Sequence, residues 1–349
     1  MSAQIKAAIA KLVERVSLSE AEAEAVMREI MDGAATPAQI AAYLTALRMK
    51  GETVDEVAGS VRVMREKAVR IRVDDPLVVD TCGTGGDRKG TFNISTAAAF
   101  VVAGAGVTVA KHGNRAASSK SGSADVLRAL GVNIDLPSAA VEDCVNQIGI
   151  GFLFAPLFHL AMKHAVAPRQ EIGVRTLFNV LGPLTNPAGA SIQILGVYAD
   201  ELTDLMAQVL VKLGSRHCFV VHGEDGLDEI TISGRTKVCE GKDGRISCYH
   251  IEPRDVGLPA AGLGAIAGGG PEENAKILLG ILAGERGPKR DIVLLNAAPP
   301  LVACGKAKDL TDGIALAARS IDSGAAREKL ERLKAKRSEE HTSELQSPT

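Results

Sequence analysis

Residues 80–96 read DTCGTGGDRKGTFNIST, and this segment is the strongest indication of the fold in the sequence. A short apolar run precedes this segment, and glycines stand at positions 83, 85, 86 and 90. We expect a helix to begin near Ser95 and Thr96. Glycine lets the backbone approach an anion closely, while exposed amides and a helix N-terminus supply positive partial charge. The segment therefore predicts a strand, a phosphate-binding loop and a helix in succession.

Two familiar nucleotide motifs do not fit this loop. GTGGD lacks the Gly-Lys-Ser/Thr ending of a P-loop, and Gly83, Gly85 and Gly86 do not match GxGxxG. Neither ATP hydrolysis nor dinucleotide binding is favoured. An ordinary strand-to-helix turn is the plain alternative, but the polar residues among the glycines favour a phosphate or pyrophosphate ligand. These polar residues are Asp87, Asn93, Ser95 and Thr96.

A second candidate anion site follows another predicted strand. Residues 111–127 read KHGNRAASSKSGSADVL, with cations at Lys111, Arg115 and Lys120. His112 and Asn114 add hydrogen-bonding groups, and several serine hydroxyls precede a predicted helix start. The stretch predicts a second cradle for phosphate, with a solvated basic turn as the alternative.

The fold class follows from the pattern after Pro76, where short apolar runs alternate with helical stretches. Buried, mainly parallel strands between glycine-rich turns and helices are typical of an α/β sheet. We therefore expect an α/β domain with a mainly parallel central sheet. The expected strands are residues 77–79, 107–109, 192–197, 218–221 and 292–295, and the expected helices begin at Ala97, Ala124, Glu201, Pro271 and Leu310.

The first 70 residues predict a small helical bundle. Ser or Thr stands three residues before Glu or Gln at three places, a spacing in which the two side chains satisfy the free amides of a helix N-terminus. The pairs are Ser19 with Glu22, Thr36 with Gln39, and Thr53 with Glu56. A further amphipathic helix is expected over residues 5–16. The predicted division is a helical domain over residues 1–72, joined by a segment near 158–185, and an α/β domain over residues 73–336.

The last residues stand apart from this division. Residues 337–348 read RSEEHTSELQSP, which resembles the translation of a common sequencing-adapter oligonucleotide. The stretch is polar and lacks hydrophobic periodicity. We interpret residues 337–349 as a non-native tail and leave them out of the fold prediction.

Composition limits the classes of partner and the compartment. Lys and Arg number 40 against 42 Asp and Glu, a net charge of −2, so no global positive field gathers nucleic acid or an anionic membrane. The longest apolar run, residues 97–110, is shorter than the roughly 20 residues of a membrane span. The N-terminal residues are too charged for a secretory signal. The six cysteines show no CxxC spacing, so we expect reduced thiols in the cytoplasm and neither a zinc site nor a disulfide framework.

Four blocks in this order resemble the anthranilate phosphoribosyltransferase family. They are residues 80–96, residues 111–127, the stretch FLFAPLFHLAMKHAVAPRQEIGVRTLFNVLGPLTNP over 152–187, and HGEDGLDEI over 222–230. The resemblance covers nearly the whole chain up to about residue 336. It implies a fold similar to that of the pyrimidine nucleoside phosphorylases, a homodimer formed through the helical domain, and Mg²⁺ as cofactor. The implied reaction transfers a phosphoribosyl group from phosphoribosyl pyrophosphate to anthranilate.

The resemblance also implies roles for individual residues. Lys111 and Asn114, with the metal, would stabilise the transition state. The anthranilate contacts would be Gly83, His112, Asn114, His159 and Arg169, and the metal ligands would be Ser95, Asp228 and Glu229. The contacts to phosphoribosyl pyrophosphate would be Gly83, Gly86, Asp87, Thr91, Asn93, Ile94, Ser95, Thr96, Lys111, His112, Gly113, Asn114, Arg115, Ala116, Ala117, Ser118, Ser119 and Ser123.

These implied roles agree with simple chemistry. Mg²⁺ usually binds through one or two carboxylates together with substrate phosphates, as Asp228 and Glu229 would provide. Arg169 offers a planar, bidentate partner for the carboxylate of a benzoate-like acceptor. The aniline nitrogen is neutral at pH 7, so His112 is not required as a base. The plain alternatives are a surface arginine for Arg169, a solvated acidic turn for Asp228 and Glu229, and packing roles for the histidines. This chain has Leu160 after His159, where many relatives have proline.

Two other functions remain open on the sequence. A pyrimidine nucleoside phosphorylase would use a related glycine loop to bind inorganic phosphate. A non-catalytic, nucleic-acid-binding relative of the family would depend on a basic surface, and the net charge of −2 together with the acidic pair counts against it. We expect neither nucleic acid nor a membrane as partner.

Overall fold

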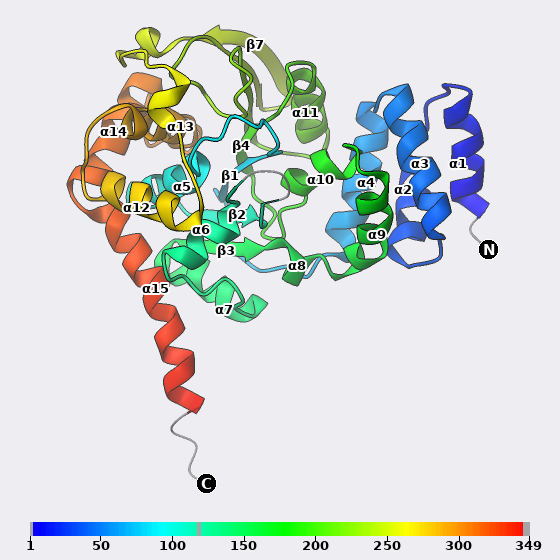
Figure 1. The fold of residues 1–349 in the computed structure, drawn as a ribbon, viewed down its shortest axis with the longest axis horizontal. Helices are drawn as coiled ribbons and strands as arrows, with labels where there is room; N and C mark the ends of the chain where they lie inside the picture. The colour runs from blue at the N-terminus through cyan, green and yellow to red at the C-terminus, as the bar shows by residue number, and fades with distance from the viewer. Residues whose placement is uncertain (1–2, 117–119, 345–349) are drawn as a thin grey trace.

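The computed structural model describes residues 3–116 and 120–344. One end of the molecule is a bundle of helices, and the other is a sheet covered by helices, from which the last helix projects (Figure 1). This arrangement confirms the predicted class, a small helical part beside a larger α/β part with a mainly parallel sheet.

The bundle is built from helices whose starts are set by local sequence. At Ser19, Thr36 and Thr53 the side-chain oxygen accepts a hydrogen bond from the backbone three residues on, and Glu22, Gln39 and Glu56 return the bond, so the three predicted capping boxes are confirmed. The first helix ends at Val13, before the expected Val16. The helices are α1 (Ala3–Val13), α2 (Glu20–Met31), α3 (Pro37–Lys50) and α4 (Val54–Lys67).

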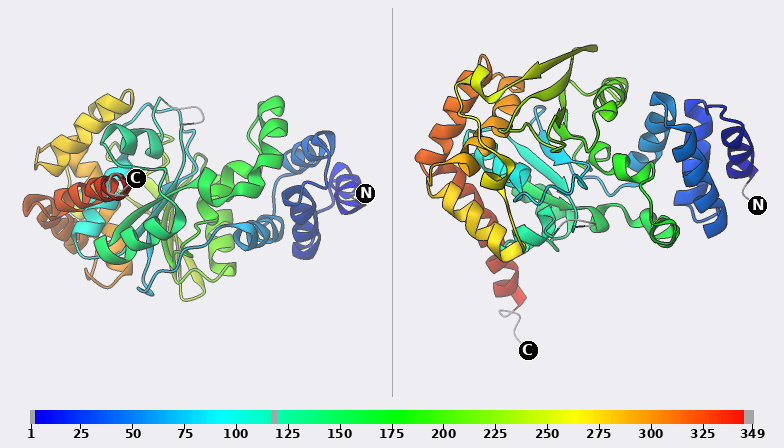
Figure 2. Two further views of the ribbon diagram at one scale, coloured as in Figure 1. Left: turned by 90° about the horizontal axis from the view of Figure 1, so that it is seen from below. Right: turned by 45° about the horizontal axis from the view of Figure 1, so that its top comes forward.

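A second chain segment completes this bundle. It comprises α8 (Ala155–Phe158), a 3-10 turn (Leu160–Met162), α9 (Lys163–Ile172) and α10 (Phe178–Leu184). Helix α9 packs on α2 and α3, and α10 packs on α4, so the green segment lies beside the blue helices in Figure 2. Leu177, Leu181 and Leu184 share one hydrophobic cluster with Ile5 and Tyr43. The segment therefore ties the bundle to the sheet that precedes and follows it in the chain.

The sheet has seven strands in the order β3-β2-β1-β4-β5-β6-β7. The first five are parallel to one another, and β6 and β7 continue the sheet as an antiparallel hairpin. The strands are β1 (Val79–Gly83), β2 (Val109–Gly113), β3 (Ile150–Phe154), β4 (Ile192–Gly196), β5 (His217–Gly223), β6 (Thr236–Lys242) and β7 (Arg245–Ile251).

The strand order reverses at β1. From β1 the chain moves outward to β2 and β3, and it then returns to the other side of β1 to form β4. In open α/β sheets, ligands bind outside the carboxyl ends of the strands at such a reversal. Gly83 and Gly196 form the last pair between β1 and β4, so the loops after these glycines frame the expected site.

Helices cover both faces of the sheet. Helix α5 (Ile94–Gly104) is buried along most of its length and packs against α13, α14 and α15. The remaining elements are α6 (Ser123–Ala129), α7 (Ser138–Asp143), a π-helical turn (Cys144–Ile148), α11 (Glu201–Lys212), 3-10 turns Pro253–Val256 and Leu263–Ile266, α12 (Pro271–Leu282), α13 (Pro288–Ala303), α14 (Leu310–Asp322) and α15 (Ala325–Glu344). Among the described residues, no helix is long and apolar enough to cross a membrane.

One predicted strand is wrong, and two begin later than expected. Residues 292–295 lie inside α13, where all four are buried, and a fully buried helix turn looks like a buried strand in sequence. Strands β1 and β2 begin at Val79 and Val109, where the predicted apolar runs end, and they continue through buried polar residues. The five predicted helix starts fall within three residues of observed helices.

The cysteine prediction is wrong as well. Cys239 of β6 lies directly opposite Cys248 of β7, and the two form a disulfide. The other four cysteines remain thiols, and Cys82, Cys144 and Cys218 are buried. Antiparallel pairing brings two residues nine positions apart into contact, which a search for CxxC spacing does not detect.

Thiol titration checks this pairing. We expect the unreduced, unfolded protein to show four thiols and the reduced protein to show all six. Replacing one partner, as in Cys239→Ser, releases Cys248, so the unreduced variant gains one thiol over the wild type. Six thiols in unreduced wild-type protein would contradict the disulfide.

Candidate active site

The glycine-rich loop lies at the carboxyl end of β1 and has the backbone that its sequence predicts. Gly85, Gly86 and Gly90 have φ values of 65°, 81° and 68°, a left-handed region that favours glycine. The amide of Gly85 donates to Asp228 Oδ2 at 2.9 Å. The loop thus presents backbone donors toward the acidic residues that follow β5.

The N-terminus of α5 continues this set of donors. Asn93 occupies the cap position without a side-chain cap bond, and the amide of Ser95 donates to Glu229 Oε1 at 3.1 Å. The predicted pair Asp228 and Glu229 therefore reaches both the loop and the helix end. Gly196 makes room for this approach, because a Cβ there would lie 1.6 Å from the carbonyl oxygen of Asp228.

Three carboxylates gather at this point. Burial raises the pKa of Asp228, and the nearby Asp87 raises it further. Burial and Asp228 raise the pKa of Glu229. Among the described residues, the buried Oδ2 of Asp87 has no hydrogen-bond partner. Mg²⁺ prefers carboxylate oxygens, and the unpartnered oxygen of Asp87 beside two further carboxylates suits the expected cation.

Lys111 joins the second cradle to the first. It lies on β2, its side chain is buried, and Nζ donates to the carbonyl of Thr81 and to Ser95 Oγ at 3.4 Å. Burial lowers the pKa of Lys111, while Asp80 opposes this shift. The ammonium thus lies beside Ser95, one of the expected metal ligands.

The second loop is held by Asp125 of α6. Its Oδ2 accepts from the amides of Ala116 and Gly122 at 3.0 and 2.9 Å. Ser123 Oγ donates to the carbonyl of Asn114 at 3.3 Å, and the side chains of Asn114 and Arg115 are exposed. Three residues that are predicted to contact phosphoribosyl pyrophosphate lie outside the described residues: Ala117, Ser118 and Ser119.

Two predicted histidines pack against each other. The ring centroids of His112 and His159 are 5.1 Å apart, and His112 Nδ1 donates to the carbonyl of Gly182 in α10 at 3.1 Å. Burial lowers the pKa of His112 to about 3 and that of His159 to about 4. Both rings are therefore neutral at pH 7, and Nε2 of His112 is a hydrogen-bond acceptor.

Arg169 lies on α9, in the segment that completes the helical bundle. Its guanidinium lies over the ring of Phe178 at 5.1 Å from the centroid, and burial lowers its pKa. Within the part of the chain that the structure describes, no carboxylate pairs with it. Arg169 thus keeps the charge and donors that a carboxylate ligand needs.

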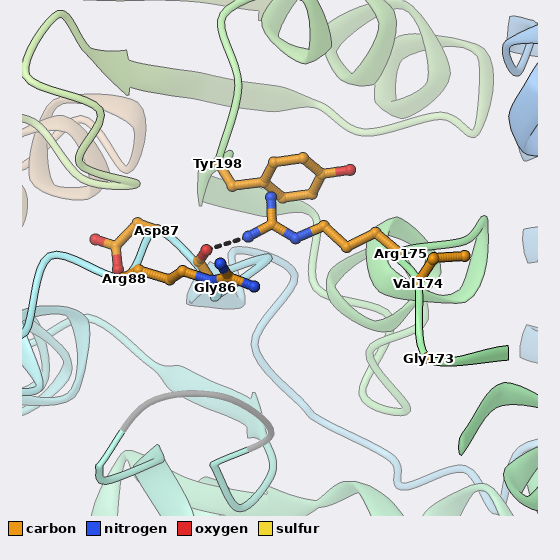
Figure 3. Close-up of a pocket in the computed structure, with 7 residues that line it drawn as sticks. All are labelled: Gly86, Asp87, Arg88, Gly173, Val174, Arg175 and Tyr198. Carbon is orange, nitrogen blue, oxygen red and sulfur yellow. Dashed lines mark hydrogen bonds between the residues drawn. The ribbon is translucent and has the colours of Figure 1, made fainter. Parts of the chain in front are cut away.

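The structure adds two residues that the sequence analysis did not single out. Arg175 stacks on Tyr198, with the guanidinium 4.0 Å from the ring centroid, and donates to the carbonyl of Gly86 (Figure 3). Both residues line a cavity of about 490 Å³. The other lining residues are Gly86, Asp87, Arg88, Gly173 and Val174. Arg175 belongs to the quoted stretch 152–187, but no local signal shows which loop it contacts.

The comparisons with known proteins agree with this geometry. Residues 75–327 match the α/β domain of a glycosyl transferase family, and residues 6–68 match its helical bundle domain. The chain is 60% identical over 329 residues to the anthranilate phosphoribosyltransferase of Anaeromyxobacter dehalogenans strain 2CP-1, covering 94% of this chain and 97% of that protein. The chain belongs to the anthranilate phosphoribosyltransferase family.

Solved structures of this family show the same fold. The anthranilate phosphoribosyltransferase from Thermus thermophilus is 47% identical and superposes with a TM-score of 0.90, covering 94% of this chain and 98% of that one. The Saccharomyces cerevisiae enzyme in complex with phosphoribosyl pyrophosphate and Mg is 31% identical, with a TM-score of 0.87 and coverage of 97% and 98%. The resemblance seen in the four sequence blocks is confirmed.

The neutral histidines predict a pH dependence of stability. Their pKa values in the fold lie below the usual 6.5, so the unfolded chain binds protons that the folded chain does not. The free energy of unfolding therefore keeps its full value above pH 6.5 and decreases as the pH falls toward 4, by up to about 1.4 kcal/mol per pH unit for each histidine. We expect His112→Gln to flatten the decline of the unfolding free energy, measured by urea denaturation between pH 7 and 4.5.

The matched control is His250→Gln, because His250 is exposed on the edge strand β7. The control variant should follow the wild-type pH dependence. A His112→Gln variant that loses stability with falling pH as steeply as the wild type would show that His112 does not resist protonation in the fold.

Proposed function

We propose that the chain transfers the 5-phosphoribosyl group from phosphoribosyl pyrophosphate to the amine of anthranilate. The products are N-(5-phosphoribosyl)anthranilate and pyrophosphate, the second step of tryptophan biosynthesis. The observation that supports this most is the meeting of the glycine-rich loop, Lys111 and the Asp228–Glu229 pair at the carboxyl edge of the sheet. A donor with a highly charged leaving group needs this combination of amides, cation and metal ligands.

The donor side works mainly through electrostatics. As the bond from the anomeric carbon to pyrophosphate breaks, negative charge grows on the leaving oxygen. This charge is stabilised by fixed hydrogen-bond donors. They are the amides of the glycine-rich loop, residues 84–93 (the 84–93 loop), together with the N-terminus of α5 and Lys111. Asp228, Glu229 and Ser95 would hold Mg²⁺, which would supply further positive charge to the pyrophosphate.

The acceptor side works through orientation. Arg169 binds the carboxylate of anthranilate, and Asn114 contacts the ring substituents. The amine attacks the anomeric carbon with inversion, a C–N bond replaces the C–O bond to pyrophosphate, and the amine releases one proton to water. Because the attacking amine is already neutral, the low pKa of His112 suits an acceptor of an N–H hydrogen bond better than a strong base. Alignment of the two substrates supplies much of the rate.

The site lies in a chain that we divide into two domains and a tail. We propose a helical domain over residues 1–72 joined by the segment near 158–185, an α/β domain over 73–336, and a non-native tail over 337–349. We also propose a cytoplasmic homodimer formed through the helical domain. Exposed apolar side chains on that domain support the dimer: Val13, Val16 and Met49 are 61%, 50% and 71% exposed.

The decisive assay follows the fluorescence of anthranilate in the presence of phosphoribosyl pyrophosphate and Mg²⁺. We expect the signal to fall as the amine is ribosylated, and pyrophosphate to appear in equal amount. Phosphorolysis of thymidine without any reaction of anthranilate would instead identify a nucleoside phosphorylase.

Arg169→Ala tests the acceptor side. Loss of a bidentate contact to a carboxylate costs about 2 kcal/mol or more, so the KM for anthranilate should rise roughly 30-fold while the KM for the sugar donor changes little. Arg254→Ala, which removes a guanidinium that pairs with Glu252 at the surface, should leave both constants unchanged. An equal rise of both KM values in Arg169→Ala would refute the assigned role.

Asp228→Asn combined with Glu229→Gln tests the metal ligands. The amide oxygens of these variants still accept from Gly85 and Ser95, so the fold should persist while the charge is lost. We expect turnover at limiting Mg²⁺ to fall at least roughly tenfold, and more metal to be needed for half-maximal rate. Glu224→Gln, an exposed residue of the same loop, is the control. An unchanged metal dependence would count against these ligands.

A further inference from the structure

The glycine-rich loop packs against a segment that lies far along the chain. Thr91 forms an isolated antiparallel bridge with Ala267, and the amide of Gly268 donates to the carbonyl of Gly90 at 2.9 Å. The two backbones are too close for a side chain between them, because a Cβ on Gly268 would lie 2.5 Å from the amide nitrogen of Phe92. The segment before α12 therefore packs directly on the loop.

Asn274, in the first turns of α12, extends this support with its side chain. It is 1% exposed, and its Oδ1 accepts from the amide of Gly269 at 2.8 Å. Its Nδ2 donates to Asn93 Oδ1 at 3.0 Å. The oxygen of the Asn274 amide thus bonds the segment just before α12, and its nitrogen bonds the cap residue of α5.

Asn93 is in turn hydrogen-bonded to Ser121, in the second predicted phosphate-binding segment. Its Nδ2 donates to the carbonyl of Ser121 at 3.1 Å, and its Oδ1 also accepts from Ser121 Oγ at 3.3 Å. Because Asn274 presents a donor, Oδ1 of Asn93 must face it and Nδ2 must face Ser121. Asn274 therefore sets the orientation of the Asn93 amide that joins the two anion-binding loops.

We propose that Asn274 is a positioning residue for the sugar-phosphate donor: acting through Asn93, it holds the 84–93 loop and residues 120–122 in the relative position that lets one donor molecule contact both. The inference rests on the proposed function, since that function assigns both loops to one ligand. Asn274 itself lies behind the loop and interacts with the ligand only through Asn93.

Asn274→Asp separates positioning from folding. The carboxylate still accepts from the Gly269 amide, so the segment before α12 keeps its bond. It offers Asn93 no donor, so the Asn93 amide turns its Nδ2 toward the new carboxylate and sets oxygen against the carbonyl of Ser121. We expect the KM for phosphoribosyl pyrophosphate to rise tenfold or more, and the KM for anthranilate to change less than twofold.

Asn146→Asp is the matched control. Like Asn274, Asn146 accepts from a backbone amide, that of Asp74, at 3.0 Å, and its Nδ2 also donates, here to the backbone carbonyl of Arg72 at 3.0 Å. It is exposed and lies outside both loops in the chain. Its variant should keep both KM values. Calorimetry of phosphoribosyl pyrophosphate binding with Mg²⁺, without anthranilate, should show that Asn274→Asp binds this substrate more weakly than the wild type.

A double-mutant cycle tests the route through Asn93. If Asn274 acts only through Asn93, Asn274→Ala has little further effect on donor affinity in the Asn93→Ala background. Full additivity of the two effects, or an equal rise of both KM values, would overturn the inference. Failure of the wild type to ribosylate anthranilate would refute the proposed function alone, because donor binding measured by calorimetry still decides whether Asn274 positions the loops.

Discussion

The site depends on negative charge that is concentrated at the reversal point of the sheet. Asp228, Glu229 and Asp87 stand close together in a place where burial raises the pKa of the first two. The backbone amides of Gly85 and Ser95 and the nearby ammonium of Lys111 offset part of this charge. The remaining charge favours a cation, which agrees with the proposed binding of a metal-bound pyrophosphate by these residues.

Charged loops of this kind need rigid support, and three buried asparagines supply it. Asn296 of α13 accepts from the amide of Ile230 and donates to its carbonyl, at 2.8 and 2.9 Å, directly after the acidic pair. Asn186 donates to Asp80 and to the carbonyl of Ala110, and so links β1 to β2. Asn274 braces the loop through Asn93. An asparagine suits each place because one side chain offers both a donor and an acceptor without charge.

The sequence predicts what local chemistry determines. Capping boxes and glycines with positive φ act within a few positions, so the helix starts and the backbone of the glycine-rich loop could be predicted from the sequence. The bonds from the three asparagines to Ile230, Asp80, Ala110 and Asn93, and the bond from Arg175 to Gly86, span from 66 to 181 residues, and nothing local marks those partners. The disulfide is different: Asp243 and Gly244 have positive φ and form a two-residue hairpin turn, a recognisable signal that sets Cys239 opposite Cys248.

The short segment between α9 and α10 links the two halves of the proposed reaction. Arg169 lies before Gly173, the left-handed cap of α9, and Arg175 lies just after it. Arg169 is available to the acceptor carboxylate, whereas Arg175 holds the carbonyl of Gly86 in the donor loop and stacks on Tyr198. Gly173 ends α9 in the left-handed region, so the chain turns between the two arginines. One short stretch of chain therefore carries both the arginine proposed for the acceptor and the arginine that contacts the glycine-rich loop.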